Sequence, residues 1–284
     1  MIDSEGASKM ISRKVTQVHQ SMLTSDGAGV TLRRTIGSQI LSELDPFLLL
    51  DNFGTENPND YIAGFPDHPH RGFETVTYMI KGLMRHRDKT GAESLLKPGG
   101  VQWMTAGRGI IHSEMPEQTE GEMSGFQLWI NLPAERKMCD PRYQDVEPEN
   151  VPEVIRGDGC KIKVIAGSVD GAVGPIDGID IEPLYLDVSL GPQGSFAHTL
   201  PGEHTAFVYV FNGSVEIKGT SVACHSLAVL GKGGEVSVQS GKGGRFIIVA
   251  GRPLGEPIAR YGPFVMNTKD EIFQAIDDYN NGRF

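Results

Sequence analysis

Cysteine is scarce in this sequence, with three residues in 284: Cys139, Cys160 and Cys224. They lie far apart, and no two of them form a C-x-x-C pair. Disulfide-rich folds and structural zinc sites use closely spaced cysteines, so this composition excludes both classes. A reducing compartment fits, and we expect the protein in the cytoplasm, or also in the nucleus if its source is a eukaryote.

Long apolar runs and an excess of basic residues are also missing. No run approaches the roughly 20 apolar residues that a membrane helix needs, and residues 1–10 are too polar for a signal peptide. The formal net charge of -10 disfavours a surface that binds nucleic acid. We therefore expect no association with a membrane and no direct binding of nucleic acid. We also expect a monomer, with a flexible leader over residues 1–14.

Glycine, by contrast, is abundant at 36 residues. Short β-rich segments separated by glycine and proline turns predict an all-β fold. Residues 136–154 interrupt this rhythm, because Pro141, Pro148 and Pro152 stand among acidic residues there. This stretch is the best candidate for a linker between two halves.

The C-terminal end has a helical pattern. Thr268 and Glu271 have the spacing of a capping box, which marks the start of a helix. The apolar residues of the predicted helix fall on one face, which we expect to be core: Ile272, Phe273, Ile276 and Tyr279. A short helix that covers a barrel end is the expected result.

Two short motifs carry the candidate chemistry. The first is H-x-H at His68 and His70, and the second is H-x-E at His112 and Glu114. Alternate side chains of an extended strand share a face, so the two residues of each motif point the same way. Two such strands side by side in a barrel bring three imidazoles and one carboxylate to one interior point.

This set of ligands predicts a particular class of metal. Three neutral nitrogens and one anionic oxygen, with no thiolate, suit divalent iron, manganese, nickel or copper with open positions. A structural zinc site more often recruits cysteine and closes its coordination. An H-x-H motif on its own is more often a chance occurrence, in which each histidine only packs against its neighbours. The second motif, after a turn-rich interval, favours the metal site.

An alternating β-rich segment follows the first motif, with these residues on one side: Glu74, Val76, Tyr78 and Ile80. If one strand runs through from His68, these side chains share the inner face of the barrel with the histidines. Pro69 weakens that continuity. Glu74 would then face the metal, as a fifth ligand or as a partner that fixes a histidine tautomer. His86 lies outside both motifs, and we expect it at the surface.

The second half of the chain repeats part of the first. Residues 205–213 (TAFVYVFNG) follow the pattern of residues 74–82 (ETVTYMIKG), and residues 226–251 contain no histidine. A duplicated barrel in which only the first copy kept its metal explains both observations. Chance similarity over so short a match is the alternative. His198 and His204 have no carboxylate at matching spacing, and we expect neither to be a ligand.

At these motifs the sequence resembles the pirins, a family of the cupin superfamily. The resemblance covers most of the chain, from about residue 33 to residue 284. It rests on residues 44–51 (LDPFLLLD), 65–78 (FPDHPHRGFETVTY), 101–107 (VQWMTAG), 111–115 (IHSEM) and 261–268 (YGPFVMNT).

The resemblance implies an all-β fold of two cupin barrels with a short C-terminal helix. Residues 1–146 would form the barrel with the metal site, and residues 147–284 a barrel that has lost it. The family implies one iron ion held by four residues: His68, His70, His112 and Glu114. Fe(II) is the preferred ion, with Mn, Ni, Cu and Co as alternatives.

The resemblance also implies two kinds of function. Some pirins are quercetin 2,3-dioxygenases, and animal pirins are nuclear transcriptional coregulators. We therefore expect a dioxygenase that opens a flavonol or a similar planar phenolic substrate with O2, with Glu114 or Glu74 as the catalytic base. The alternative is a non-enzymatic, iron-binding redox sensor or regulator that acts through a protein partner.

Overall fold

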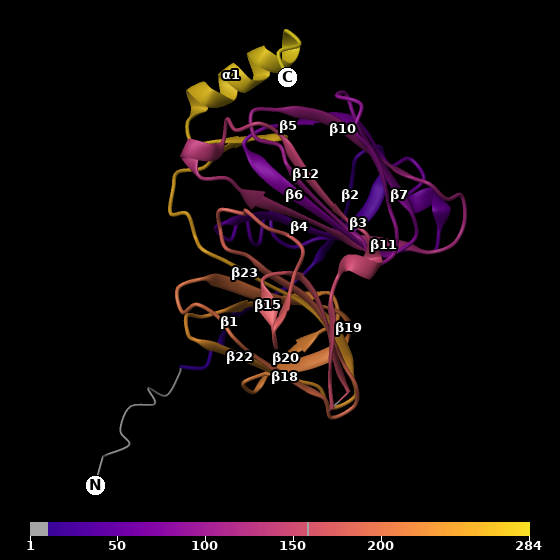
Figure 1. Ribbon diagram of the computed structural model, residues 1–284, viewed down its shortest axis with the longest axis vertical. Coiled ribbons are helices and arrows are strands. Elements are labelled where there is room, and N and C mark those ends of the chain that lie inside the picture. The colour runs from indigo at the N-terminus through magenta and orange to yellow at the C-terminus, as the bar shows by residue number, and fades with distance from the viewer. Residues whose placement is uncertain (1–10, 158) are drawn as a thin grey trace.

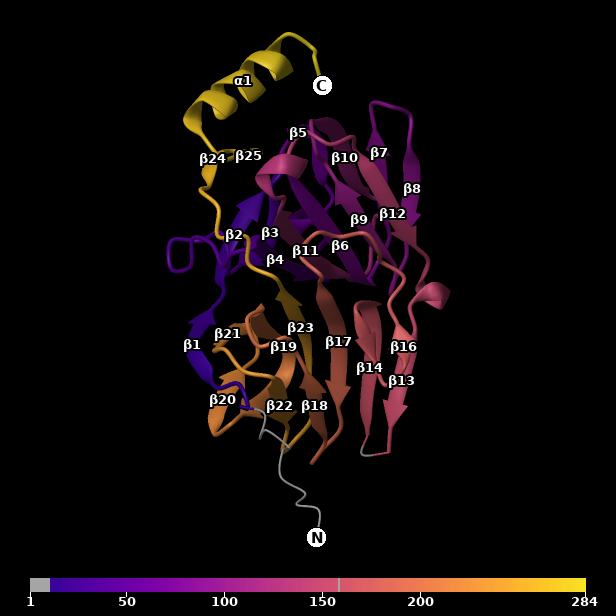
Figure 2. The same cartoon turned by 60° about the vertical axis from the view of Figure 1, so that its left-hand side comes forward.

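The protein is described by a computed structural model over residues 11–157 and 159–284. It forms two β-barrels stacked along the long axis of the molecule, and helix α1 (Lys269–Asn280) lies beyond the first barrel. Figure 2 shows the same stack from the side, with the first barrel above the second. The expected all-β class, with two barrels and one short C-terminal helix, is confirmed.

The first barrel consists of a seven-stranded and a four-stranded antiparallel sheet. In spatial order, the large sheet contains β12 (Arg142–Val146), β9 (Val101–Thr105), β6 (Phe73–Lys81), β11 (Met123–Asn131), β4 (Phe47–Thr55), β3 (Val30–Arg34) and β2 (Met22–Asp26). The small sheet contains β5 (Phe65–His70), β10 (Ile110–Pro116), β7 (Met84–Asp88) and β8 (Glu93–Leu96).

The second barrel follows the same plan. In spatial order, its main sheet contains β1 (Val15–Gln20), β21 (Ser226–Leu230), β19 (Thr205–Ile217), β23 (Gly244–Gly251), β17 (Leu184–Leu190), β14 (Cys160–Ala166) and β13 (Glu153–Arg156). The strands that close this barrel are β18 (Ser195–Thr199), β22 (Glu235–Gln239) and β20 (Thr220–Ala223).

The minor elements lie outside these sheets. They are β15 (Ser168–Val169), β16 (Ala172–Val173), β24 (Ala259–Tyr261), β25 (Phe264–Met266) and the 3-10 helices Pro58–Asp60, Ala134–Arg136 and Pro148–Asn150.

The two large sheets face each other across a shared apolar core. Strands β6 and β19 occupy the same place in their sheets, as the sequence repeat predicts. Val76 and Tyr78 of β6 and Phe207 and Tyr209 of β19 all belong to this one buried cluster. The repeated segments therefore mark equivalent strands, whose shared apolar face is the contact between the barrels.

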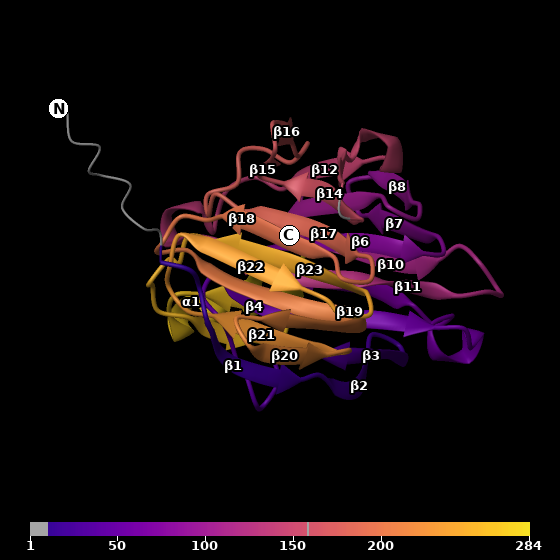
Figure 3. The ribbon, with the colours of Figure 1, turned by 90° about the horizontal axis from the view of Figure 1, so that it is seen from below.

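The two ends of the chain cross over between the barrels. Strand β1 pairs with β21 and takes the edge position in the second sheet that β12 takes in the first, as Figure 3 shows from below. At the other end, Phe264 bridges to Arg71 of the first barrel, and Asp278 of α1 forms an ion pair with Arg71 at 2.7 Å. The division of the chain into two domains at residue 146 stays a prediction. In the structure, each end of the chain also contacts the barrel formed by the other half.

The leader predicted for residues 1–14 is wrong for its last four residues, while residues 1–10 lie outside the described part. Arg13 is fully buried in the second barrel. Its guanidinium donates hydrogen bonds of 2.7–2.8 Å to the carbonyl oxygens of Pro201, His204 and Gly233. A buried arginine with its donors satisfied fixes this segment in place.

Helix α1 begins as the sequence predicts, with a complete capping box between Thr268 and Glu271. Ile272 is buried in a cluster with Phe264 and Met266 of β25. Phe273 is 66% exposed and Tyr279 is 39% exposed, so the predicted apolar face is wrong at these two positions. Among the described residues, none of the helices combines the length and the apolar character that crossing a membrane requires.

Candidate metal centre

Three histidines meet inside the first barrel, as the two motifs predict. His68 and His70 lie on β5, and the antiparallel register with β10 places His112 directly opposite His68. One ring nitrogen from each of the three lies within 4.8 Å of the others. The pairing of the two strands therefore brings together residues that are more than 40 positions apart in the chain.

Each of these rings keeps at least one nitrogen that forms no hydrogen bond among the described residues. Nδ1 of His68 donates to the carbonyl oxygen of Pro66 at 2.8 Å, and Nδ1 of His112 lies 2.9 Å from Nε2 of His86. Nε2 of His112 and both ring nitrogens of His70 are buried and have no hydrogen-bond partner within the described residues. Buried polar atoms normally have partners, so this cluster of unpaired nitrogens fits a metal ion.

Burial also sets the protonation state of the cluster. Desolvation holds the pKa of His70 and of His112 well below 6.5, and the neighbouring histidines lower both pKa values further. Both rings are therefore neutral at pH 7. A neutral imidazole offers the lone pair that a metal ion requires.

Aromatic side chains fix the orientation of His70. The ring centroids of Phe73 and Trp129 lie 5.0 and 5.1 Å from that of His70. Trp129 in turn donates its indole N–H to Gln127 at 3.0 Å. The wall of the cluster on this side is apolar and rigid, with a polar edge at Gln127.

Glu114 is buried on the same face of β10 as His112, as the H-x-E motif predicts. Its carboxylate is held by two donors: Thr77 Oγ1 at 2.8 Å and Gln127 Nε2 at 2.7 Å. It does not belong to the group of ligand atoms within 4.8 Å of one another, which contains the three histidines. Each carboxylate oxygen accepts one hydrogen bond, which leaves acceptor capacity on both.

Glu74 does not face the histidines, so the expectation of an inward Glu74 is wrong. Strand β5 ends at His70, and the chain turns at Gly72, where φ is +87° and a Cβ atom would lie 2.0 Å from the carbonyl oxygen of Val265. Strand β6 begins at Phe73 in the other sheet. The side chain of Glu74 therefore shares the face of Val76, which points to the second barrel.

At this position Glu74 is an isolated buried acid. It is 3% exposed and accepts a hydrogen bond of 2.6 Å from Thr105 Oγ1. Burial raises its pKa from 4.5 to about 7, although the bond from Thr105 opposes the shift. Glu74 is therefore neither a ligand nor a base of the cluster in this structure.

His86 is the residue that the motifs missed, and its predicted surface position is wrong. It is 1% exposed, lies opposite Glu114 in the pairing of β7 with β10, and contacts His112 through its Nε2. The alternation of Met84, Arg85, His86 and Arg87 places His86 on the apolar side of its strand. That alternation is the signal that would have found it.

Comparisons with known proteins agree with this architecture. Family models match residues 29–130 as Pirin and residues 185–284 as the Pirin C-terminal cupin domain. A Pseudomonas aeruginosa protein named "Putative quercetin 2,3-dioxygenase PA3240" is 52% identical over 277 residues, which span 95% of this chain and 97% of the relative. Human pirin is 43% identical over 279 residues, which span 96% of this chain and 94% of pirin.

A solved structure agrees as well. The crystal structure of quercetin 2,3-dioxygenase from Acinetobacter baumannii superimposes with a TM-score of 0.90 at 34% identity, over 96% of this chain and 99% of that one. The family resemblance drawn from the motifs is confirmed. This chain belongs to the pirin family, with a pirin domain followed by the pirin C-terminal cupin domain.

Proposed function

We propose that this protein is a metal-dependent dioxygenase that opens the central ring of a flavonol or a similar planar phenol and releases carbon monoxide. The observation that carries the proposal is the group of buried, unpaired nitrogens of His70 and His112 beside His68. The names of similar proteins support the reaction class, because a quercetin 2,3-dioxygenase of known structure is 34% identical and a relative named "Putative quercetin 2,3-dioxygenase PA3240" is 52% identical.

In this proposal the three histidines hold one divalent ion through Nε2, and Glu114 is the fourth ligand. Fe(II) is our preferred ion, with Mn, Ni, Cu and Co as alternatives, because a set of nitrogens and one carboxylate suits all five. When bound, the ion supplies Lewis acidity that makes the hydroxyl group of the substrate easier to ionise.

The chain's own residues would bind and deprotonate the substrate. Glu114 would accept the proton of the flavonol 3-hydroxyl, since its oxygens keep acceptor capacity beside the bonds from Thr77 and Gln127. The rings of Phe73 and Trp129 would keep the wall apolar and exclude water. Glu74 has no role in this step, because it faces the second barrel.

The first experiment asks whether the activity exists. The protein is loaded anaerobically with each of the five metals, mixed with quercetin and exposed to O2. Quercetin absorbance and carbon monoxide are then followed. We expect both signals with at least one metal. If none of the loaded forms consumes quercetin, the enzyme proposal fails. The site is then better explained by an iron-binding regulator that acts through a protein partner.

A second experiment assigns the role of Glu114. The change Glu114→Gln keeps the size and one oxygen but removes the charge and most of the basicity. We expect much of the metal to remain and turnover to fall by roughly 10²–10⁴, the usual value of a positioned base. Turnover that returns to the native value when normalised per bound metal would show that Glu114 is a ligand only. Glu74→Gln is the matched control and should leave turnover unchanged.

A cytoplasmic monomer remains our proposal for the state of the protein. Its three cysteines are scattered along the chain and form no C-x-x-C pair, which fits a reducing compartment. Sedimentation of the purified chain at micromolar concentration would test the monomer.

A further inference from the structure

A second candidate site lies between the two barrels, apart from the metal centre. It is a cleft of about 920 Å³ whose lining residues come from both barrels and include none of the three clustered histidines. Its volume is in the range of sites for small organic molecules. Strand β6 begins at Phe73 beside His70 and ends at Lys81 on the cleft. Its nine residues put the two sites roughly 25 Å apart along the strand.

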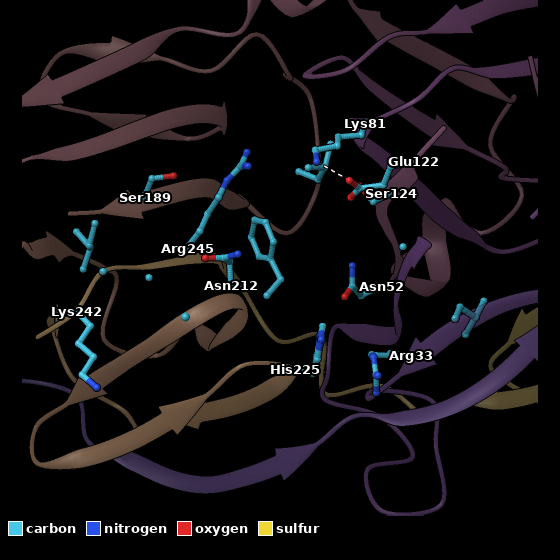
Figure 4. Close-up of a pocket in the computed structure, with 18 of the residues that line it drawn as sticks. Arg33, Asn52, Lys81, Glu122, Ser124, Ser189, Asn212, His225, Lys242 and Arg245 are labelled. Atoms are coloured by element: carbon cyan, nitrogen blue, oxygen red, sulfur yellow. Dashed lines mark hydrogen bonds and ion pairs between the residues drawn. The ribbon is translucent and has the colours of Figure 1, made fainter. Parts of the chain in front are cut away.

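Basic side chains from both barrels line this cleft. Arg33 and Lys81 line it from the first barrel, and Lys242 and Arg245 line it from the second, as Figure 4 shows. Among the described residues of the lining, Glu122 is the one carboxylate, in a protein whose formal net charge is -10. A cleft lined by one sign of charge concentrates ligands of the opposite sign.

Two of these cations have no carboxylate of their own. Lys81 forms an ion pair with Glu122 at 2.5 Å, and Arg245 forms one with Asp187 at 2.6 Å. Arg33 and Lys242 form no ion pair within residues 11–157 and 159–284. They stand on opposite sides of the cleft (Figure 4), so an anion between them would contact both barrels.

The walls of the cleft are held by hydrogen bonds between the barrels. Tyr78 of β6 donates to Asp187 of β17 at 2.7 Å, and the same carboxylate anchors Arg245. The Arg245 guanidinium lies over the ring of Phe211, 5.1 Å from its centroid. Because these groups are already fixed, a ligand would not have to order this part of the wall.

Further groups in the lining have unused polar capacity. Nδ1 of His225 is buried without a hydrogen-bond partner in the described part of the chain. Gly243 and Gly244 lie between Lys242 and Arg245 in the chain, so the backbone there has no side chains that block a ligand. Phe211 and Ile80 supply apolar surface to the same cleft.

We propose that this cleft binds a small organic anion with at least two negative charges, of the phosphate or polycarboxylate kind. One acidic group lies against Arg33 and the other against Lys242, and the organic body packs on Phe211. The ligand connects the two barrels at a distance from the metal centre, so the proposal does not depend on the dioxygenase reaction.

The test is calorimetric titration of the metal-loaded, full-length protein with ADP, citrate and adenosine. Adenosine is the uncharged counterpart of ADP, and citrate separates carboxylate from phosphate recognition. The variants are Arg33→Gln and Lys242→Gln, each of which removes a cation that has no ion pair. Lys232→Gln is the matched control, because Lys232 is exposed and pairs only with the exposed Glu203. We expect each cleft variant to raise the Kd by about tenfold, the usual effect of losing one charged contact, and the control to leave it unchanged.

Binding of ADP, of citrate or of both, with a Kd that rises at least threefold in both cleft variants, supports the proposal. A response to only one of the two anions identifies phosphate or carboxylate as the recognised group. The proposal is overturned if neither anion binds, if adenosine binds as tightly as ADP, or if either variant changes the Kd less than threefold. An unchanged Kd in the variants would also reveal that the anion binds at the metal, since binding there does not need Arg33 or Lys242.

Discussion

The interiors of the two barrels differ although their strand orders correspond. The first barrel buries polar groups: His70, Thr75, Thr77, His86, Gln102, His112 and Glu114. The second is filled by apolar side chains, among them Phe196, Val208, Val236, Val238, Phe246 and Ile248. The same scaffold therefore supports a candidate reaction centre in one copy and a packed core in the other.

The apolar interior of the second barrel serves the stability of the fold, whereas the polar interior of the first barrel suits chemistry. Each large apolar side chain that is fully buried stabilises the fold by about 1.5–3 kcal/mol, whereas a buried polar group costs free energy unless it is paired. In the first barrel most of these polar groups have partners, but Nε2 of His112 and both ring nitrogens of His70 have none among the described residues. Because buried polar atoms normally have partners, unpaired groups gathered at one point of a well-packed protein indicate a binding site.

The largest expected effect lies in the apolar barrel. Phe246→Ala removes a fully buried ring whose centroid lies 6.0 Å from that of Phe196. We expect a loss of about 3–5 kcal/mol in the free energy of unfolding, because the cavity cannot close completely. Chemical denaturation measures it, and metal content per folded chain should stay at one. A loss below about 1 kcal/mol would contradict a tightly packed second barrel.

A loss of metal binding is the expected effect in the polar barrel. His112→Ala removes the ring that both motif strands place at the centre of the cluster. We expect metal affinity to fall at least 100-fold, beyond what the loss of an outer partner causes. His198→Ala on β18 of the second barrel is the matched control. Elemental analysis after reconstitution should give about one metal per chain for the control and the native protein. Two metals per chain in the native protein would refute the comparison.

The sequence predicts the histidine cluster well because the information is local. Two motifs on short strands need only an antiparallel pairing to meet, and His112 does lie opposite His68. The face of Glu74 could not be predicted in this way. The turn at Gly72 moves the chain into the other sheet, which shifts the side-chain alternation between the two strands. The exchanged ends depend on contacts between distant segments, such as β1 with β21, which no local pattern contains.

Glu74 lies on the face of the first barrel that meets the second barrel. The sequence repeat places Thr205 at the equivalent position of the second barrel, so a change at Glu74 compares the two faces. Burial raises the pKa of Glu74 from 4.5 to about 7, so the folded state holds this proton more tightly than the unfolded state. Ionisation of Glu74 therefore destabilises the fold as the pH rises from about 4.5 to about 7. We expect Glu74→Gln to stabilise the protein by roughly 3 kcal/mol at pH 8 and to have little effect at pH 4. Unfolding curves at both pH values measure this, and equal effects at the two would contradict a buried acid.

His86 gives the smallest and most specific effect. Its Nε2 lies 2.9 Å from Nδ1 of His112, so it holds that nitrogen in a hydrogen bond and leaves Nε2 of His112 for the metal. His86→Phe keeps a ring that can pack against Tyr143, whose centroid is 5.1 Å away, but removes the hydrogen bond. We expect metal affinity to fall about tenfold, at the low end of the range for partners that orient a ligand, with no change in stoichiometry.

Two further variants show whether the effect of His86 comes from this hydrogen bond. His86→Gln can still form a hydrogen bond with His112 and should recover part of the affinity, whereas His198→Phe in the second barrel should change nothing. Competition with a chelator of known affinity measures all three Kd values. If His86→Phe binds metal like the native protein, His86 only fills space. The polar interior of the first barrel would then be specialised at the three clustered histidines and not in the shell around them.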